Sequence, residues 1–421
     1  MSLQGPLIVV AETPATGLIE ALGAAGAFPI VEATWADAPT AFVSVKPSAV
    51  VIADAGPPPS ESAARMLCLQ IATAQGAIVP TIALTHAGQA AAIPIALPVD
   101  GAQPVERLIA RLQSAMRVRS LHATVLRRIE LFAAEGTEPP ALPLNDALED
   151  ATVLVAGRGP IYPALSVAMG ERVKMIGALS VENAARYLDA RDIDGIVIGD
   201  GFSPRMVEAF LTVLAQEQRL RDVPVMVIGE LPDGLTGSLP NVDHVDGDPE
   251  RLVARMMPLV RMHAFEVRLK RMLKSLDTNG MLDPATGLHT GDAFWRDLNK
   301  AVAEAADRSH PLSLARYSFE GAVDERASMD GARLVTKLMR NIDFATRDTD
   351  GAILIAFPQT DLRNAHVVAR RIAGSIKNAM LTPQRSQDRI TANVTLATLK
   401  NDDTLDSLML RVMGSRMVAA E

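Results

Sequence analysis

Two side chains near the carboxyl end of the chain, Arg340 and Asp343, stand three residues apart and are of types that can bind a polar ligand. The guanidinium of an arginine can donate two parallel hydrogen bonds to a phosphate or to the O6 and N7 atoms of a guanine. A carboxylate can accept hydrogen bonds from the N1–H and N2–H groups of the same base. The alternative is an ion pair between residues three apart at a helix end, which adds only a few tenths of a kcal/mol.

A predicted helix and a predicted hairpin flank this pair and must position it. Residues 348–351 read Asp-Thr-Asp-Gly, and an Asp-Gly step is a strong hairpin signal. Residues 352–357 are a nearly continuous apolar run, as expected for a strand buried on both faces. The helix before the pair is predicted from an apolar stripe at helical spacing. The stripe consists of Leu334, Val335, Leu338, Met339 and Ile342.

Length and composition indicate a soluble protein of two to three domains. The chain has 421 residues, of which 48% are hydrophobic and 21% are charged, and this length exceeds one ordinary core. No apolar run is long enough to span a bilayer, and the N-terminus lacks the pattern of a signal peptide. The single cysteine, Cys68, cannot form an internal disulfide. We therefore expect a cytoplasmic protein without membrane insertion.

The charges argue against two classes of function. A net charge of −8 disfavours a protein built to bind nucleic acid. The seven histidines show no metal-ligand spacing, so no metal site is predicted. Six arginines of a long helix predicted at residues 104–134 are interpreted as a solvent-exposed basic face. They are Arg107, Arg111, Arg117, Arg119, Arg127 and Arg128.

Strands and helices alternate through the first part of the chain and then repeat. Strands are predicted at residues 6–11, 29–33, 49–53, 79–85 and, weakly, 93–97, and again at 151–156, 173–177, 195–199 and 223–229. This alternation predicts two doubly wound parallel sheets. Similar sequences at residues 106–111 and 250–255 suggest an internal duplication. The helix at 250–276 is predicted to present a partner-facing seam of Leu252, Met256, Val260, Val267 and Met272.

The two copies resemble the receiver domains of two-component response regulators. That family places an acidic pair for Mg²⁺ after its first strand, a phosphoacceptor aspartate at the end of the third, a Ser or Thr after the fourth, and a Lys-Pro step after the fifth. In the first copy, Asp54 and Thr85 match, Glu12 keeps one acid, and the lysine position reads Leu97-Pro98. An aspartate that closes a strand can equally be a strand terminator or a helix cap.

The second copy matches the receiver pattern only at Asp200. Its acidic, hydroxyl and lysine positions fall on Gly157-Arg158, Gly229 and Asp248-Pro249. We interpret both copies as degenerate receivers. Asp54 of the first copy, with Glu12 and Thr85, is the candidate phosphoacceptor, and Mg²⁺ is expected only if that copy is phosphorylated.

The last part of the chain resembles a GGDEF domain, the fold of diguanylate cyclases. Residues 283–294 read Asp-Pro-Ala-Thr-Gly-Leu-His-Thr-Gly-Asp-Ala-Phe, like the opening signature of that family. Residues 357–361, Phe-Pro-Gln-Thr-Asp before a predicted helix, give a second, separate match. The resemblance covers the chain to Glu421 and implies an α/β domain with a mainly antiparallel sheet.

The residues that this family uses for catalysis are replaced. Synthesis of cyclic di-GMP from GTP requires carboxylates that hold two Mg²⁺ ions. The Gly-Gly-Asp/Glu-Glu-Phe positions read Thr-Asp-Gly-Ala-Ile at residues 349–353, so that Gly351 and Ala352 replace the carboxylates. Other family positions fall on Tyr317 for the second metal carboxylate, Thr290 for the guanine-reading asparagine, and Arg411 and Arg416 as the cations nearest to the missing lysine. The resemblance therefore implies a fold kept without its catalyst.

GGDEF proteins often bear an allosteric Arg-x-x-Asp site for cyclic di-GMP, five residues before the signature. Arg340 and Asp343 have that spacing, and Arg347, Arg370 or Arg371 could complete the site. The resemblance thus implies a non-catalytic cyclic di-GMP receptor that forms a homodimer through the receivers and long helices and acts through an unidentified protein partner. The alternatives are a dimeric scaffold without a nucleotide ligand and, least favoured, an active cyclase.

The predicted architecture is an α/β protein of two receiver-like doubly wound parallel-sheet domains followed by a GGDEF-type domain. The predicted boundaries are 1–135 for the first domain with its long helix, 136–147 for a Pro-rich linker, 148–276 for the second domain with its long helix, and 277–421 for the third.

Overall fold

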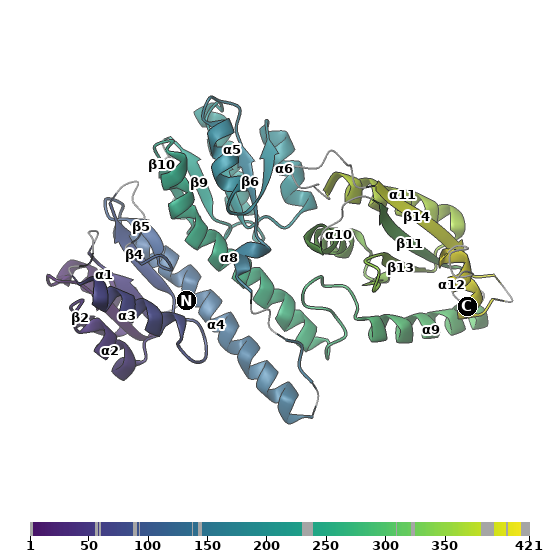
Figure 1. Cartoon of the computed structure of the whole chain (residues 1–421), viewed down its shortest axis with the longest axis horizontal. Coiled ribbons are helices and arrows are strands. Elements are labelled where there is room, and N and C mark those ends of the chain that lie inside the picture. Colours follow the sequence, from purple (N-terminus) through teal and green to yellow (C-terminus); the bar gives the residue numbers. More distant parts are fainter. Residues whose placement is uncertain are drawn as a thin grey trace. The chain divides into compact units, whose positions relative to one another are not determined.

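The computed structural model describes residues 3–54, 58, 60–86, 91, 93–136, 138–141, 145–229, 239–308, 310–320, 325–379, 391–400 and 403–413. The chain forms two compact units (Figure 1). Unit 1 comprises Met1–Arg128 and Pro143–Leu269, and unit 2 comprises Ile129–Leu142 and Lys270–Glu421. Each unit is described by itself.

The first half of unit 1 is a five-stranded parallel sheet in the order β2-β1-β3-β4-β5. Its elements are β1 (Gln4–Val10), α1 (Thr16–Ala24), β2 (Phe28–Ala33), α2 (Ala38–Val45), β3 (Ala49–Ile52), α3 (Glu61–Ala72), β4 (Thr81–Thr85), β5 (Leu97–Asp100) and the long α4 (Val105–Ala134). The short strands β3 and β5 are fully buried, as expected when helices cover both faces of a parallel sheet, whereas the edge strand β2 is largely exposed. This strand order is one of the two common doubly wound orders.

Two details of this half differ from the prediction. Helix α2 was not predicted. The weak strand predicted at residues 93–97 lies instead at Leu97–Asp100 and runs through Pro98. Because β5 is the edge strand of its sheet, it tolerates a proline that a central strand would exclude.

The second half of unit 1 repeats this topology, with the order β10-β9-β8-β6-β7. Its elements are the 3₁₀ turn η1 (Ala147–Glu149), β6 (Thr152–Ala156), α5 (Tyr162–Gly170), β7 (Lys174–Ala178), α6 (Val181–Ala190), β8 (Gly195–Ile198), α7 (Pro204–Gln216), β9 (Val225–Ile228), β10 (Val242–Val245) and α8 (Pro249–Asp277). Strand β10 was missed, because its four residues include Asp243 and His244 and lack an apolar run.

The two halves of unit 1 share buried surface. One apolar cluster joins Leu108 and Leu112 of α4 to Leu259 of α8. Three of the five residues of the seam predicted to face a partner, Leu252, Met256 and Val260, pack instead in the core of the second half. This part of the prediction was wrong, because the helical apolar stripe does not say which surface covers it.

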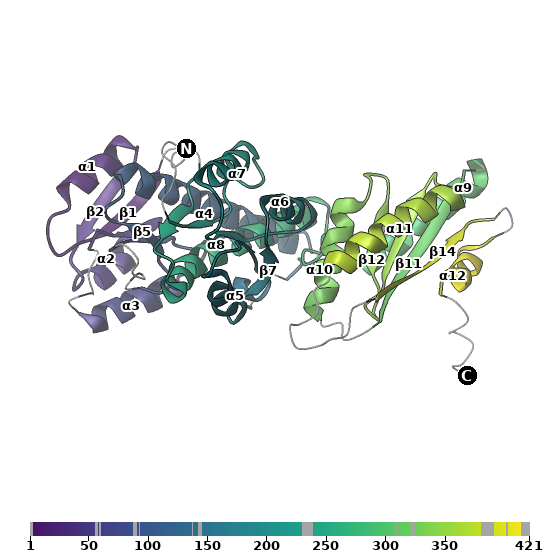
Figure 2. The same cartoon turned by 90° about the horizontal axis from the view of Figure 1, so that it is seen from above.

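Unit 2 contains a four-stranded antiparallel sheet in the order β12-β13-β11-β14, which confirms the predicted antiparallel sheet. Its elements are α9 (Gly291–Arg308), β11 (Leu312–Glu320), α10 (Glu325–Leu338), β12 (Phe344–Arg347), β13 (Ile353–Pro358), α11 (Leu362–Ala379), β14 (Thr391–Thr398) and α12 (Leu405–Met413). Figure 2 shows α11 lying along the sheet.

The apolar run in β13 is explained by two cores, one on each face of this sheet. Ile353, Ile355 and Phe357 pack with residues of α10 and α11, whereas Leu354 and Ala356 pack with residues of α9 and α12. A strand buried on both faces needs apolar residues at every position.

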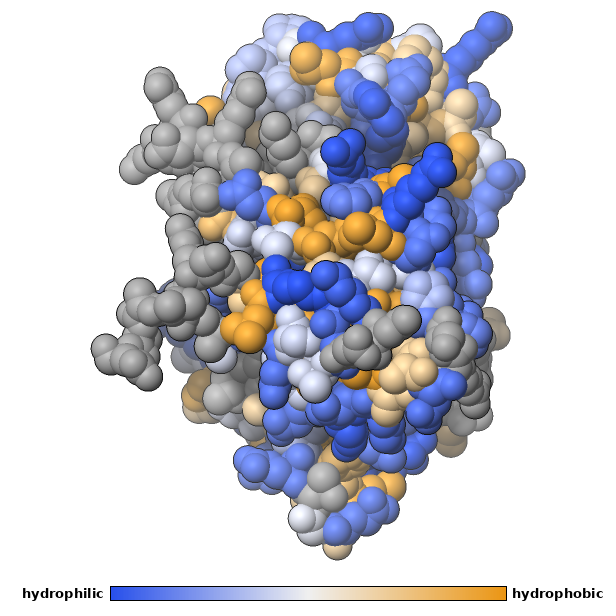
Figure 3. Space-filling model, turned by 90° about the vertical axis from the view of Figure 1, so that its right-hand side faces the viewer, coloured by the Kyte–Doolittle hydropathy of each residue, from blue (hydrophilic) through white to orange (hydrophobic). Residues whose placement is uncertain are grey.

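At the end of the molecule seen in Figure 3, apolar surface residues occur in patches bordered by hydrophilic ones.

Candidate functional site

Arg340 and Asp343 lie in a turn after α10 and not on the helix. Helix α10 ends at Leu338, and the backbone N–H of Asp343 donates to the carbonyl of Arg340 at 3.0 Å. The Asp343 carboxylate oxygen Oδ2 accepts from the backbone N–H of Arg340, also at 3.0 Å. The helical ion pair considered as an alternative is therefore absent. Ile342, assigned to the helical stripe, is exposed for the same reason.

The two side chains of this turn have opposite environments. Asp343 is only 7% exposed, and its second oxygen, Oδ1, is buried without a hydrogen-bond partner among the described residues. The Arg340 side chain is exposed, and its guanidinium makes no hydrogen bond or ion pair within the described part of the chain. Burial raises the pKa of Asp343, against the hydrogen bond from Arg340 and the charges of Arg340 and Arg371.

Of the three arginines proposed to complete the site, only Arg371 acts on Asp343. Its charge opposes the raised pKa of the Asp343 carboxyl. Arg347 is instead paired with Glu325 at 2.6 Å. Arg370 lines a surface groove on α11 together with Leu362, Arg363, His366 and Val367. The Arg347 side chain thus projects from β12 towards Glu325 at the start of α10.

The hairpin turn has the predicted position and a specific geometry. The backbone N–H of Gly351 donates to the carbonyl of Asp348 at 3.0 Å, and that of Asp348 donates to Ala352 at 2.8 Å. Gly351 has a φ of 81°, a left-handed conformation that glycine adopts without strain. Asp350 forms an ion pair with Arg316 of β11 and also accepts from the backbone N–H of Ala352 at 3.0 Å. The turn is therefore tied to the neighbouring strand.

The other family positions hold structural contacts. Tyr317 is fully buried within β11, and its hydroxyl donates to the carbonyl of Ala369 at 3.2 Å. Burial raises the pKa of Tyr317. Arg411 is paired with Asp403, and Arg416 lies outside the described residues. In the described part of the chain, no three His, Cys, Asp or Glu side chains are grouped to hold a metal ion.

Asp54 and Glu12 lie side by side at the carboxyl edge of the first sheet. The Asp54 carboxylate accepts from the backbone N–H of Glu12 at 2.9 Å. The Glu12 carboxylate in turn accepts from the backbone N–H of Trp35 at 3.0 Å. Thr85 is buried; its hydroxyl donates to the carbonyl of Val99 at 3.2 Å. The three residues are therefore each engaged in contacts of the folded chain.

The structure agrees with one of the two predicted lysine positions. Asp248-Pro249 follows β10, which ends at Val245, as the pattern requires. Leu97-Pro98 instead begins β5, which ends at Asp100. None of these residues is a lysine.

The arginine face of α4 is the principal feature that sequence reasoning missed. Arg107 and Arg111 are buried, and Arg111 is only 1% exposed, so the interpretation as a solvent-exposed face was wrong for both. Arg127 and Arg128 are exposed as predicted. Both buried guanidinium groups reach Asp243 of β10, at 3.2 and 2.9 Å.

A third arginine completes this buried cluster. Arg255 of α8 lies 3.5 Å from Asp243 and donates to the hydroxyl of Thr85 at 3.1 Å. Burial acts to raise the pKa of Asp243, but the charges of Arg111, Arg255 and Arg107 outweigh it and hold that pKa below its ordinary value. The similar segments at residues 106–111 and 250–255 were the only sequence signal for this contact.

Comparison with known proteins gives matches to solved structures only. No protein-family model matches the sequence, and no curated protein matches it. The coiled coil and GGDEF domain of DgcB from Caulobacter crescentus, in complex with c-di-GMP, is 21% identical over 35% of this chain and 83% of its own, with a TM-score of 0.30. The GGDEF domain of FimX from Pseudomonas aeruginosa is 19% identical over 32% and 89%, with a TM-score of 0.28.

A third similar structure contains a protein partner. Diguanylate cyclase SiaD from Pseudomonas aeruginosa, in complex with its activator SiaC, is 18% identical over 39% of this chain and 70% of its own, with a TM-score of 0.29. The similarity to each of these proteins is thus limited to a part of the chain. No helix in the described residues is both long and apolar enough to cross a membrane.

Proposed function

We propose that this chain is a non-catalytic receptor for cyclic di-GMP, which binds at Arg340 and Asp343 and acts through contact with another protein. The observation that carries the proposal is the buried, unpartnered Oδ1 of Asp343 in the same turn as the unpaired guanidinium of Arg340. A buried carboxylate oxygen without a donor costs free energy. A ligand that donates to it would remove that cost.

A guanine dinucleotide has the groups that this turn lacks. The N1–H and N2–H groups of guanine can donate to the Asp343 carboxylate, while the O6 and N7 atoms or a phosphate can accept from the Arg340 guanidinium. Arg371, whose charge acts on Asp343, supplies the second cation of the proposed site. Binding requires no metal ion. We place the protein in the cytoplasm, as its cysteine content favours.

Calorimetric titration with cyclic di-GMP tests the receptor role. Wild type is expected to bind in the micromolar range or tighter, and Arg340→Ala is expected to lose at least about tenfold in affinity, as for the loss of a bidentate charged contact. Arg363→Ala is the matched control, because Arg363 is exposed on α11 in a separate groove. Absence of heat from wild type would reject the receptor role and favour a ligand-independent scaffold.

The absence of catalysis is part of the proposal and has its own support. Gly351 and Ala352 provide no carboxylate. The Arg316–Asp350 ion pair occupies the turn at which the backbone of GGDEF cyclases approaches the nucleotide. Purified protein with GTP and Mg²⁺ is expected to form no cyclic di-GMP. Gly351→Asp is expected to stay inactive and to lose about 1 kcal/mol of stability, because the residue sits at positive φ. Turnover by wild type would overturn this part.

A further inference from the structure

Helix α11 carries a surface groove that combines positive charge with exposed aliphatic side chains. The groove has a volume of about 560 Å³. It is lined by Leu362, Arg363, His366, Val367 and Arg370, and we call these five residues the α11 surface. Leu362 is 46% exposed and Val367 is 66% exposed. Because positions three and four apart are neighbours on a helix, the five side chains form one continuous patch.

The charge of this helix is opposite to that of the whole chain. Its 18 residues include three arginines and one lysine but no aspartate or glutamate, whereas the chain carries a net charge of −8. Within the part of the chain that the structure describes, Arg363 and Arg370 form no ion pair or hydrogen bond through their side chains. The nearest acid along the sequence, Asp361, instead accepts from the backbone N–H of Asn364 at 2.8 Å and caps the helix. No described ion pair therefore balances the positive charge of the α11 surface.

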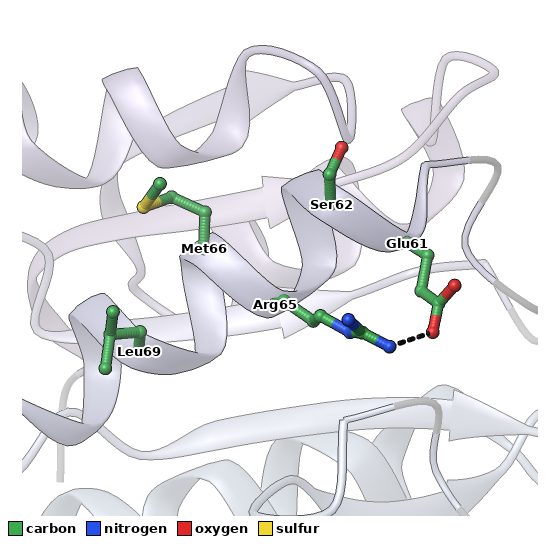
Figure 4. Close-up of a pocket in the computed structure, with 5 residues that line it drawn as sticks. All are labelled: Glu61, Ser62, Arg65, Met66 and Leu69. Carbon is green, nitrogen blue, oxygen red and sulfur yellow. Dashed lines mark hydrogen bonds and ion pairs between the residues drawn. The ribbon is translucent and has the colours of Figure 1, made fainter.

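A groove on α3 differs from the α11 surface in its charge. It is lined by Glu61, Ser62, Arg65, Met66 and Leu69, and the last two side chains are exposed. Figure 4 shows the guanidinium of Arg65 paired with the carboxylate of Glu61, at 2.6 Å. The α3 groove thus offers a partner aliphatic contact without a net charge to recognise, whereas the α11 surface offers both.

The chemistry that complements the α11 surface is that of an acidic, amphipathic protein segment. Carboxylates of such a segment can each accept two parallel hydrogen bonds from Arg363 or Arg370. Its aliphatic residues can cover Leu362 and Val367, and this burial adds affinity. Complementary charges across an interface also raise the association rate and discriminate against other partners.

Two other anionic partners fit this surface less well. The net charge of −8 repels a nucleic acid, and α11 has no Phe, Tyr or Trp on which a base could stack. A membrane surface requires a helix with a large apolar face free to insert. The main apolar face of α11 is not free, because Val368, Ile372 and Ile376 pack in the core of unit 2.

We propose that the α11 surface docks an acidic, amphipathic segment of a partner protein. The proposal names the partner chemistry for the protein contact in the proposed function, and it rests on that contact and not on cyclic di-GMP binding. Arg371, assigned to the dinucleotide site, follows Arg370 in the sequence but does not line the groove. The two sites can therefore be tested separately.

Fluorescence anisotropy with full-length protein, in the absence of cyclic di-GMP, tests the proposal. The probe is a fluorescein-labelled synthetic helix that carries leucines flanked by glutamates, and its control is the same peptide with every glutamate replaced by glutamine. Wild type is expected to bind the acidic peptide in the micromolar range and the neutral peptide at least about tenfold more weakly, because the charged contacts are lost. Added salt should weaken binding of the acidic peptide, since it screens exposed charges.

Variants of the α11 surface separate charge from aliphatic contact. Arg363→Glu and Arg370→Glu are each expected to weaken binding of the acidic peptide by about tenfold or more, and Val367→Ser by about threefold or more. The matched controls in unit 2 are Arg296→Glu on α9 and Leu410→Ser on α12, both at exposed positions outside the α11 surface. Both controls are expected to leave binding unchanged. Unchanged circular dichroism and melting temperature check the fold of every variant.

Several outcomes would overturn the proposal. They are no binding of the acidic peptide by wild type, equal binding of the neutral peptide, and an equal loss of binding in the control variants. Tighter binding of a single-stranded RNA or of phosphatidylserine vesicles than of the acidic peptide would overturn it as well. None of these outcomes bears on the dinucleotide site, which the calorimetric titration tests.

Discussion

Thr85 of β4 and Arg255 of α8 come from the two halves of unit 1 and are joined by a hydrogen bond of 3.1 Å from the guanidinium to the hydroxyl oxygen. A receiver-like site would use the Thr85 hydroxyl to couple phosphorylation to movement of the strand. In this chain the hydroxyl is bonded to the second half of unit 1. The same guanidinium also reaches Asp243. A candidate switch residue is thus part of a buried ionic contact.

The engagement of these residues leads us to predict that Asp54 does not accept a phosphoryl group. Glu12 uses one carboxylate oxygen to accept from the backbone N–H of Trp35, and the Thr85 hydroxyl is bonded to Val99 and Arg255, so these contacts compete with binding to Mg²⁺ or a phosphoryl oxygen. Incubation with acetyl phosphate and Mg²⁺ is expected to leave the intact mass unchanged. A phosphoryl mass increment in wild type that disappears in Asp54→Asn would contradict this prediction.

Removal of the buried carboxylate at Asp243 is expected to destabilise unit 1 strongly. Asp243→Asn would leave three buried guanidinium groups without their shared counter-ion, and breaking such a pair typically costs about 3–5 kcal/mol. Asp222→Asn is the control, since Asp222 pairs with Arg117 at a partly exposed site and should cost about 1 kcal/mol or less. Urea denaturation measures both. Equal, small losses would show that the cluster contributes little.

Two adjacent arginines of α11 are expected to differ in their effect on ligand binding. Arg371→Ala is predicted to weaken cyclic di-GMP binding by about tenfold, because the Arg371 charge acts at Asp343. Arg370→Ala should change the affinity by less than about twofold, since Arg370 lines a separate groove with Val367. Calorimetry on the two variants gives the comparison. The reverse order of effects would exclude Arg371 as the second cation.

Asp343→Asn is expected to stabilise the apo protein while weakening ligand binding. Burial raises the folded-state pKa of Asp343 above its ordinary value of 3.8. Between pH 3.8 and the raised pKa, the Asp343 carboxyl of the unfolded chain loses its proton before that of the folded protein, so the free energy of unfolding falls as pH rises. Above the raised pKa the carboxyl is ionised in both states, and the folded protein carries the full cost of burying its charge. The amide carries no charge to bury, which makes its burial cheaper than that of the carboxylate, and its oxygen can still accept from the Arg340 N–H.

The measurement is urea denaturation with and without cyclic di-GMP. The variant should be more stable than wild type at neutral pH, and the difference should vanish below pH 3.8. Its affinity for the dinucleotide should fall by at least about tenfold, because a charged acceptor is lost. A variant that is less stable at neutral pH would show that the carboxylate is satisfied in the folded protein.

Local patterns in the sequence determined most of the elements. Alternating apolar runs and helical stripes predicted the two parallel sheets, and the Asp-Gly step predicted the turn at Gly351, because these features depend on neighbours within a few residues. The duplication was readable from two similar helices. The short β10 escaped prediction because its contacts, not its composition, make it a strand.

The tertiary structure alone decided the environment of each charged residue. Arg111 and Arg127 lie on one helix and look alike in sequence, yet Arg111 is buried because Asp243, 132 residues away in the chain, lies against it. Arg340 and Asp343 were paired by spacing, but only the fold buries the carboxylate and exposes the guanidinium. Charge and spacing are local properties, whereas burial depends on segments distant in sequence.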